Sequence, residues 1–191
     1  SLNISSGATV FIDNANSGSY ALSNALTGSG VLHVVLIGTG GFSFNFNPSA
    51  GTAFTGTTQL GNGTFTLSGQ NTAALANGTL QLDSSNTTIV GAGAQSIGNL
   101  TLNGGTLSFA NLPTGTITTG ALTLNSGRVR IDPANASTSG NLLAQDEGSI
   151  QQLISATSVT GPTSNLTLTN LSGAALSSST ANIVQGGNTV A

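Results

Sequence analysis

Apolar and polar residues alternate along short segments throughout the chain. Examples are FSFNF at 42–46, TLQL at 79–82 and TLSF at 106–109. Alternation with a period of two predicts β-strands that have one buried side and one outward side. Glycine and asparagine, which favour turns, separate these segments, as in GNG at 61–63 and NGG at 103–105. The chain is therefore expected to be almost entirely β-structure.

One apolar pattern occurs twice, at an offset of 22 residues. LTLNGGTLSF at 100–109 is followed by LTLNSGRVRI at 122–131. Self-similarity of this kind is typical of solenoids, in which coils stack and equivalent side chains share an interior column. The residues predicted to form this core stack are Leu100, Leu102, Leu107, Phe109, Leu122, Leu124, Val129 and Ile131.

Glycines before the outgoing strands indicate a coil of similar length. Gly63, Gly78, Gly105, Gly127 and Gly148 are on average about 21 residues apart. Because strands carry the repeat, the pattern predicts an all-β fold, a parallel β-helix with coils of roughly 20–25 residues. An antiparallel β-sandwich, which uses similar strands and turns, is the alternative, although it does not require a repeat.

Two finer expectations follow from the same pattern. Residues 1–60 match the spacing less clearly than the rest of the chain. Asn103 and Asn125 occupy equivalent turns, and we expect them to stack as a hydrogen-bonded ladder.

The composition agrees with stacked coils and excludes some partners. Charged residues are 4% of the chain, against roughly 25% in ordinary domains. Stacking places equivalent residues of successive coils over one another, so stacked like charges would repel whereas stacked Ser, Thr and Asn would not. An apolar fraction of 37% and a mean hydropathy of +0.22 suffice for a core. Two arginines form no basic patch, and there is neither a cysteine nor a long apolar run, so we expect no nucleic-acid partner and no membrane insertion.

The candidate binding residues are Arg128, Arg130 and Asp132, which alternate on one side of one strand. They form either a site for an acidic sugar or, more simply, a solvated face with a local salt bridge. His33 lies in the apolar stretch VLHVVLIG at 31–38, which indicates a packed or edge histidine rather than a catalytic one. No catalytic residue, metal ligand or cofactor is predicted.

A carbohydrate-active enzyme is the alternative function that β-helices allow. Polysaccharide lyases and hydrolases need clustered carboxylates, either as an acid–base pair or as calcium ligands. The acids available here are few and scattered: Asp13, Asp83, Asp132, Asp146 and Glu147.

The stretch TAFTGTTQLGNGTFTL at 52–67 resembles the passenger-associated repeat of bacterial autotransporters, the AIDA-like adhesin family. That repeat reads Asn-Thr-Tyr-Thr-Gly-Gly-Thr-Thr-Val, a short gap, then Gly-Thr-Leu. Phe54-Thr55-Gly56 matches its aromatic-Thr-Gly step, and Gly63-Thr64-Phe65 matches its closing strand. A compressed copy at 67–82 replaces the aromatic step by two alanines, and 97–109 has a similar texture.

The resemblance implies a fold, a location and a role. Autotransporter passengers are long right-handed β-helices exported across the outer membrane to the bacterial cell surface. Residues 1–191 would be one segment of such a passenger, without the barrel or a signal peptide. The implied role is adhesion, self-association and biofilm formation, with like passengers on neighbouring cells, host surface glycans or matrix proteins as partners. A passive spacer that displays another domain is a further alternative.

Overall fold

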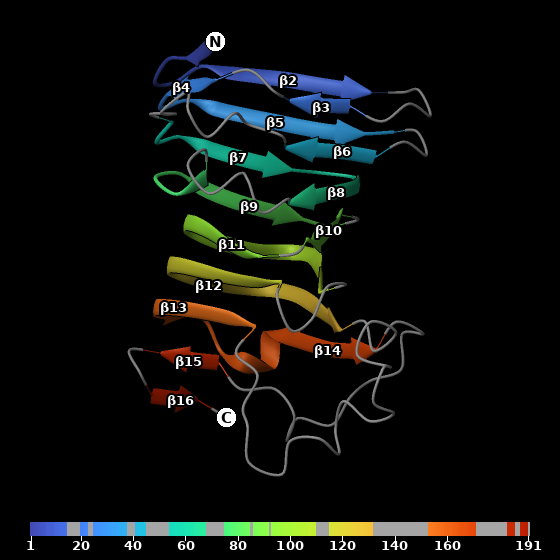
Figure 1. The fold of residues 1–191 in the computed structure, drawn as a ribbon, viewed down its shortest axis with the longest axis vertical. Coiled ribbons are helices and arrows are strands. Elements are labelled where there is room, and N and C mark those ends of the chain that lie inside the picture. Colours follow the sequence, from blue (N-terminus) through green and yellow to red (C-terminus); the bar gives the residue numbers. More distant parts are fainter. Residues whose placement is uncertain are drawn as a thin grey trace.

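The computed structural model confirms the stacked parallel β-helix (Figure 1). In each coil the chain passes three faces in turn, which we name faces A, B and C. Most strands have three to seven residues and end at a corner, whereas β11, β12 and β13 continue around corners. The structure describes residues 1–14, 20–22, 25–37, 41–44, 54–67, 75–84, 86–91, 93–109, 115–131, 153–170, 183–185 and 188–190.

Face B is a continuous ladder along the stack. Each of its strands pairs in parallel with the strand one coil before and the strand one coil after. In order, the face consists of β2 (Thr9–Asn14), β5 (Val31–Leu36), β7 (Thr57–Leu60), β9 (Thr79–Asp83), the middle of β11 (Ala94–Phe109), the middle of β12 (Thr116–Ile131) and the end of β13 (Ile154–Thr160).

Faces C and A complete each coil. Face C consists of β3 (Tyr20–Leu22), β6 (Gly41–Phe44), β8 (Gly63–Leu67), β10 (Asn86–Val90), the ends of β11 and β12, and β14 (Leu166–Asn170), which follows the short 3-10 helix η3 (Thr163–Asn165). Face A contains β1 (Leu2–Ile4), β4 (Leu26–Gly28), the starts of β11, β12 and β13, and β15 (Ile183–Gln185), on which β16 (Asn188–Val190) folds back.

The direction of pairing decides between the two architectures that the sequence allowed. Among the described strands, every pair is parallel except β15 with β16. The antiparallel sandwich is therefore wrong. The predicted core stack is confirmed in its register, because Leu100, Leu102, Leu107 and Phe109 pair with Leu122, Leu124, Val129 and Ile131.

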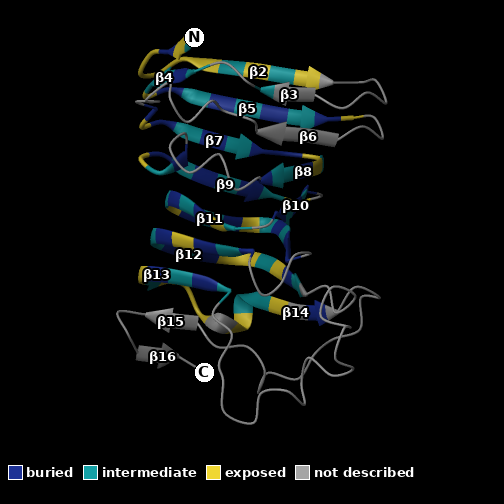
Figure 2. Ribbon diagram, viewed as in Figure 1, coloured by how far each residue is buried: buried dark blue, intermediate teal, exposed yellow. Residues whose placement is uncertain are grey.

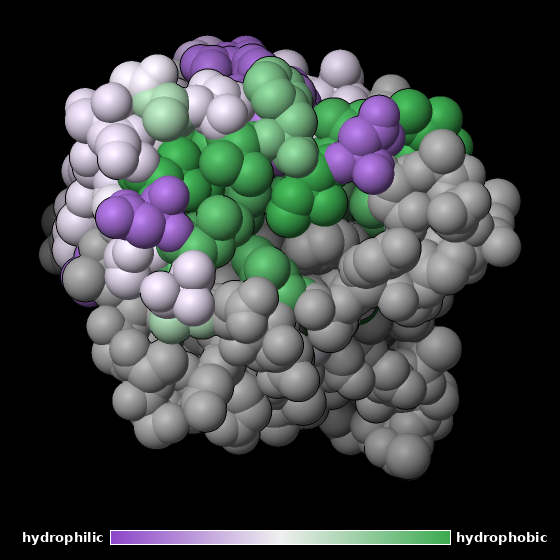
Figure 3. Space-filling model, turned by 90° about the horizontal axis from the view of Figure 1, so that it is seen from above, coloured by the Kyte–Doolittle hydropathy of each residue, from purple (hydrophilic) through white to green (hydrophobic). Residues whose placement is uncertain are grey.

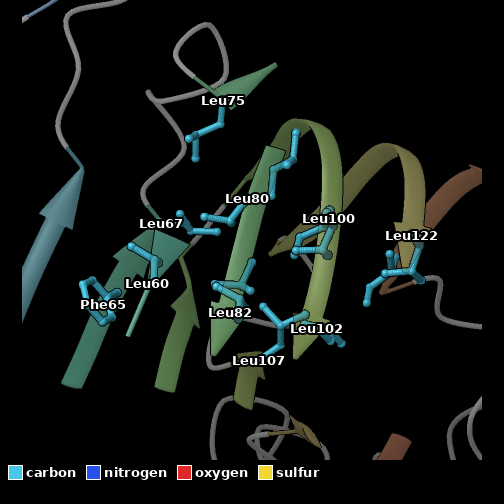
Figure 4. Close-up of a cluster of buried hydrophobic side chains, with 14 of the residues drawn as sticks. Leu60, Phe65, Leu67, Leu75, Leu80, Leu82, Leu100, Leu102, Leu107 and Leu122 are labelled. Carbon is cyan, nitrogen blue, oxygen red and sulfur yellow. The ribbon is translucent and has the colours of Figure 1, made fainter. Parts of the chain in front are cut away.

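The core fills the inside of the coils. In β5, Leu32, Val34 and Leu36 are buried and the residues between them are partly exposed, as the period of two requires. The same alternation recurs from coil to coil (Figure 2). Leu60, Leu82 and Leu102 come from successive strands of face B and lie in one column of the interior (Figure 4). Burial of such side chains stabilises the fold by about 1.5–3 kcal/mol each.

A column of glycines forms the corner between faces A and B. A Cβ on Gly120 would lie 2.6 Å from the carbonyl oxygen of Gly98, closer than real Cβ atoms approach. These carbonyls also accept the hydrogen bonds that hold the coils together, as in Asn99 N–H to Gly78 O at 2.9 Å. Only glycine leaves the space for this contact, and the column comprises Gly30, Gly56, Gly78, Gly98 and Gly120.

The glycine spacing used to estimate the coil length combined two corners. Gly105 and Gly127 are stacked neighbours at the corner between faces B and C, where a Cβ on Gly127 would lie 3.2 Å from the Gly105 oxygen. Gly78 instead belongs to the column between faces A and B. Gly148 lies outside the described residues. The average spacing was still close to the coil length, because each of the two corners occurs once in every coil.

Residues 1–60 form part of the stack with unequal spacing, since β2 pairs with β5 at an offset of 22 residues and β5 with β7 at 26. One finer expectation was wrong. Asn103 and Asn125 are not register partners, because a shift after Leu102 places Asn103 beside Ser126. The Asn103 amide instead bonds to a residue of the preceding coil, Asp83.

The first coil exposes part of the interior. Viewed from the N-terminal end, apolar side chains gather at the centre of the described surface and polar ones surround them (Figure 3). Leu2, Val10, Ile12 and Leu22 pack against the core from this end and are only partly buried. Their strands pair on one side only among the described strands.

Candidate functional site

Face B carries one outward column of rings and amides across four coils. Phe11 of β2 is the register partner of His33, His33 of Gln59, and Gln59 of Gln81. The column continues through threonines at 101 and 123. Successive strands are about 4.8 Å apart, so the first four positions span roughly 14 Å. We name Phe11, His33, Gln59, Gln81, Asp83 and Asn103 the face B strip.

Three amides from three coils converge on one carboxylate. Gln59 Nε2 donates to Asp83 Oδ2 at 2.5 Å, and Gln81 Nε2 donates to Asp83 Oδ1 at 2.8 Å. Asn103 Nδ2 donates to Oδ1 at 3.1 Å. The carboxylate thus accepts three hydrogen bonds from neutral groups, and these bonds fix the planes of three carboxamides on the surface.

The environment of Asp83 favours its ionised form. Partial burial by itself raises the pKa of the carboxyl group, but the hydrogen bonds from the three amides act in the opposite direction. The positive charge that His33 can carry lowers the pKa further. The net result is a pKa below the ordinary value of 3.8, as expected for a carboxylate whose charged form accepts several N–H bonds.

Two aromatic rings lie next to this network. The ring centroids of Phe11 and His33 are 5.3 Å apart and their planes are inclined by 52°. Phe11 is 69% exposed, whereas His33 is half-buried. Gly61 leaves room for the imidazole, because a Cβ there would lie 3.3 Å from His33 Nε2. His33 therefore points to the outer side of its strand and does not join the core.

The arginines predicted as binding residues lie on a different face. Arg128 and Arg130 are outward residues of β12 on face C, at the register positions of Thr106 and Ser108. Arg128 is exposed and Arg130 is half-buried. Asp132 lies outside the described residues, so the predicted trio is described only in its two arginines.

The described acids do not form a hydrolase pair. Asp13 is on β2 and Asp83 on β9, three strands apart along face B, which is roughly 14 Å. Glycoside hydrolases place their two carboxyl groups about 5–9.5 Å apart. Asp146 and Glu147 lie outside the described residues. Within the described part of the chain, no group of three metal-ligating side chains comes together.

Sequence reasoning missed the face B strip for a definite reason. Its hydrogen bonds connect residues 24, 2 and 20 positions apart. Gln59 and Asp83 are separated by one 22-residue coil and two further strand positions, Gln81 and Asp83 lie on one strand, and Asn103 follows Asp83 by a 20-residue coil. A search at a fixed offset of 22 aligns Gln59 with Gln81 but not Asp83 with Asn103. The available signal was the set of amides that stand next to a leucine in TTQL, TLQLD and LTLN.

The fold and its surface together define a β-solenoid with largely uncharged outer ladders. An 85-residue stretch, 44% of the chain, is 42% identical to part of the uncharacterized lipoprotein YdeK of Escherichia coli strain K12. The matched stretch is 6% of that protein's length, so the chain spans only a small part of its relative. No family model matches the chain, and no solved structure matches it. None of the described segments is a helix of the length and hydropathy that a membrane crossing requires.

Proposed function

We propose that this chain is a segment of a bacterial cell-surface adhesin, a stiff β-helical rod whose outer faces make cell–cell or cell–surface contacts. The observation that carries the proposal is the chemistry of the outward columns. They consist mainly of hydroxyl and amide side chains in register, and charged residues are 4% of the chain. Two such faces meet without electrostatic repulsion and offer each other repeated donors and acceptors.

Two further observations support this role and location. The sequence resembles the repeats of autotransporter passengers, and the motif residues occupy structural positions: Phe54 is buried and Gly56 forms part of the glycine corner. The relative in Escherichia coli is named a lipoprotein, which favours a location in the cell envelope. Export beyond the envelope is part of the proposal.

The test is clustering of cells that display the chain on their surface. We expect displaying cells to aggregate or to coat surfaces, and we expect aggregation to persist in high salt. Salt shortens the Debye length from about 10 Å at 0.1 M to about 3 Å at 1 M, and contacts between hydroxyls and amides do not depend on it. Cells that display the chain and cluster no more than cells without it would refute adhesion and favour the spacer.

A charge variant identifies the face that makes the contact. Thr101→Asp with Thr123→Asp places two carboxylates on adjacent coils of face B, and like charges on opposed molecules repel. Dispersal of the cells at low salt, with recovery at high salt, is the expected result. Thr64→Asp with Thr87→Asp, on adjacent coils of face C, is the matched control. Equal effects of both pairs would mean that neither face is specific.

A further inference from the structure

The face B strip combines two kinds of surface that a sugar chain requires. Phe11 presents an aromatic ring at 69% exposure beside the imidazole of His33. Phe11 and Ile37 are the exposed large hydrophobic residues of the described chain, so this ring is an exception on a polar surface. The C–H face of a pyranose is apolar and packs against such a ring, which removes apolar surface from water.

The amides supply the second surface. Each carboxamide has two N–H donors and an oxygen with two lone pairs. Gln59, Gln81 and Asn103 each use one N–H on Asp83, which leaves one N–H and one oxygen per amide. Their planes are fixed before any ligand arrives, so binding loses less side-chain entropy. Planar groups with adjacent donors and acceptors match the hydroxyls on neighbouring carbons of a sugar.

The charge of the strip selects among glycans. Asp83 is the carboxylate of the strip, and its hydrogen bonds come from neutral amides. The two arginines of the chain, Arg128 and Arg130, lie on face C. A glycan that carries carboxylates or sulfates would meet the like charge of Asp83 on face B, away from both arginines of the chain. Neutral glycans meet no such cost.

From this geometry we propose that the face B strip binds a neutral glycan chain, aligned with the long axis of the stack. One sugar ring packs on Phe11 and His33, and the following units hydrogen-bond to the amides around Asp83. The strip spans roughly 19 Å across five strands, which is the scale of a short oligosaccharide. The inference names a partner for the proposed adhesin and rests on that function for its biological role.

Titration of the purified chain with cellohexaose and chitohexaose tests the inference, with an oligogalacturonate as the acidic comparison. We expect a neutral hexasaccharide to bind and the acidic one not to bind. Phe11→Ala should weaken binding at least tenfold and Phe11→Tyr should retain it, since the ring is preserved. Gln81→Ala should weaken binding severalfold. Arg128→Ala on face C and Thr123→Ala, farther along the same column, are matched controls that should bind as the unchanged chain does.

Several results would overturn the inference. These are binding of the acidic oligomer alone, no binding of either neutral hexasaccharide, or binding that is unchanged in Phe11→Ala or in Gln81→Ala. Thermal unfolding of each variant shows that a loss of binding is not a loss of fold. Cell clustering is scored separately. Clustering without hexasaccharide binding would refute glycan binding by the strip but not the adhesive function. Hexasaccharide binding without clustering or coating of surfaces would refute the adhesive function but not glycan binding by the strip.

Discussion

Among the described residues, the inner columns of face B and face C each contain one buried threonine, and the two threonines have different surroundings. Thr58 of β7 lies between Leu32 and Leu80 in register and has no exposed surface. Its Oγ1 has no hydrogen-bond partner among the described residues. A hydroxyl that gives up water without a replacement partner costs free energy, about 1–3 kcal/mol in proteins.

Thr88 of β10 occupies the corresponding kind of position on face C, between Phe65 and Leu107. Its Oγ1 donates to Oδ1 of Asn86 at 2.9 Å, and both side chains are buried. Face C thus provides a polar partner inside the stack, although Asn86 Nδ2 has none among the described groups. The comparison shows that a solenoid tolerates a polar residue in an inner column with or without a local partner, but at different cost.

The apolar column beside Thr58 should contribute the largest single-residue effect on the free energy of unfolding. Leu102 has no exposed surface and lies between Leu82 and Leu124. Leu102→Ala should lower the free energy of unfolding by about 2–5 kcal/mol, because the column leaves a cavity that rigid coils cannot close. Urea unfolding measures the change. Thr101→Ala, on the outward side of the same strand, is the control and should change stability by less than about 0.5 kcal/mol. Equal effects would mean that the column is not the core.

The apolar columns were predictable from the sequence because stacking makes their repeat visible. Leu100 and Leu102 recur as Leu122 and Leu124 at the same offset, and the structure pairs them as expected. A change of one residue in register would turn every inward side chain outward, so the core itself constrains this spacing. The β-helix and its parallel pairing followed from that repeat.

The surface could not be predicted in the same way. Asp83 bonds diagonally to Gln59 and across a shorter, 20-residue coil to Asn103, so its partners come from unequal offsets. A register shift after Leu102 also separates Asn103 from Asn125. Outward residues also carry no constraint comparable to core packing. The sequence directed attention to Arg128 because charges are rare, whereas the amide network consists of common neutral residues.

The Asn86 side chain should stabilise the stack through Thr88. Asn86→Ala removes the acceptor and leaves the buried hydroxyl of Thr88 unpaired, so we expect a loss of about 1–3 kcal/mol in urea unfolding. Adding Thr88→Val to this variant should recover part of the loss, because the unpaired hydroxyl is gone. Thr87→Ala, the outward neighbour, is the control. If Thr88→Val lowers stability as much in the Asn86→Ala variant as it does in the unchanged chain, the two side chains are not coupled.

The two threonines should respond with different signs to the same replacement. Thr58→Val removes a hydroxyl without a partner and keeps the branched shape, so stability should rise by about 1 kcal/mol. Thr88→Val removes a hydroxyl that is bonded to Asn86 and should not stabilise the chain. Paired urea or thermal unfolding curves measure both, with the outward Thr57→Val as reference. The distinction between the columns fails if Thr58→Val lowers stability as much as Thr88→Val does.

Asp83 extends the comparison to the surface, where a polar group has three partners instead of one or none. Its pKa is lowered in the folded chain. The network therefore stabilises the fold at pH values above the ordinary pKa of 3.8, and this stabilisation is lost as the pH falls through the folded pKa. The contribution should be less than about 1 kcal/mol, because the group is largely solvated and water screens it.

The measurement is the free energy of unfolding at about pH 6 and about pH 3. The unchanged chain should lose more stability on acidification than Asp83→Asn does. Gln81→Leu, which removes one of the three donors, should show an intermediate loss because the pKa of Asp83 moves back towards its ordinary value. Parallel pH profiles for the unchanged chain and Asp83→Asn would mean that the amides orient the carboxylate without favouring its charge.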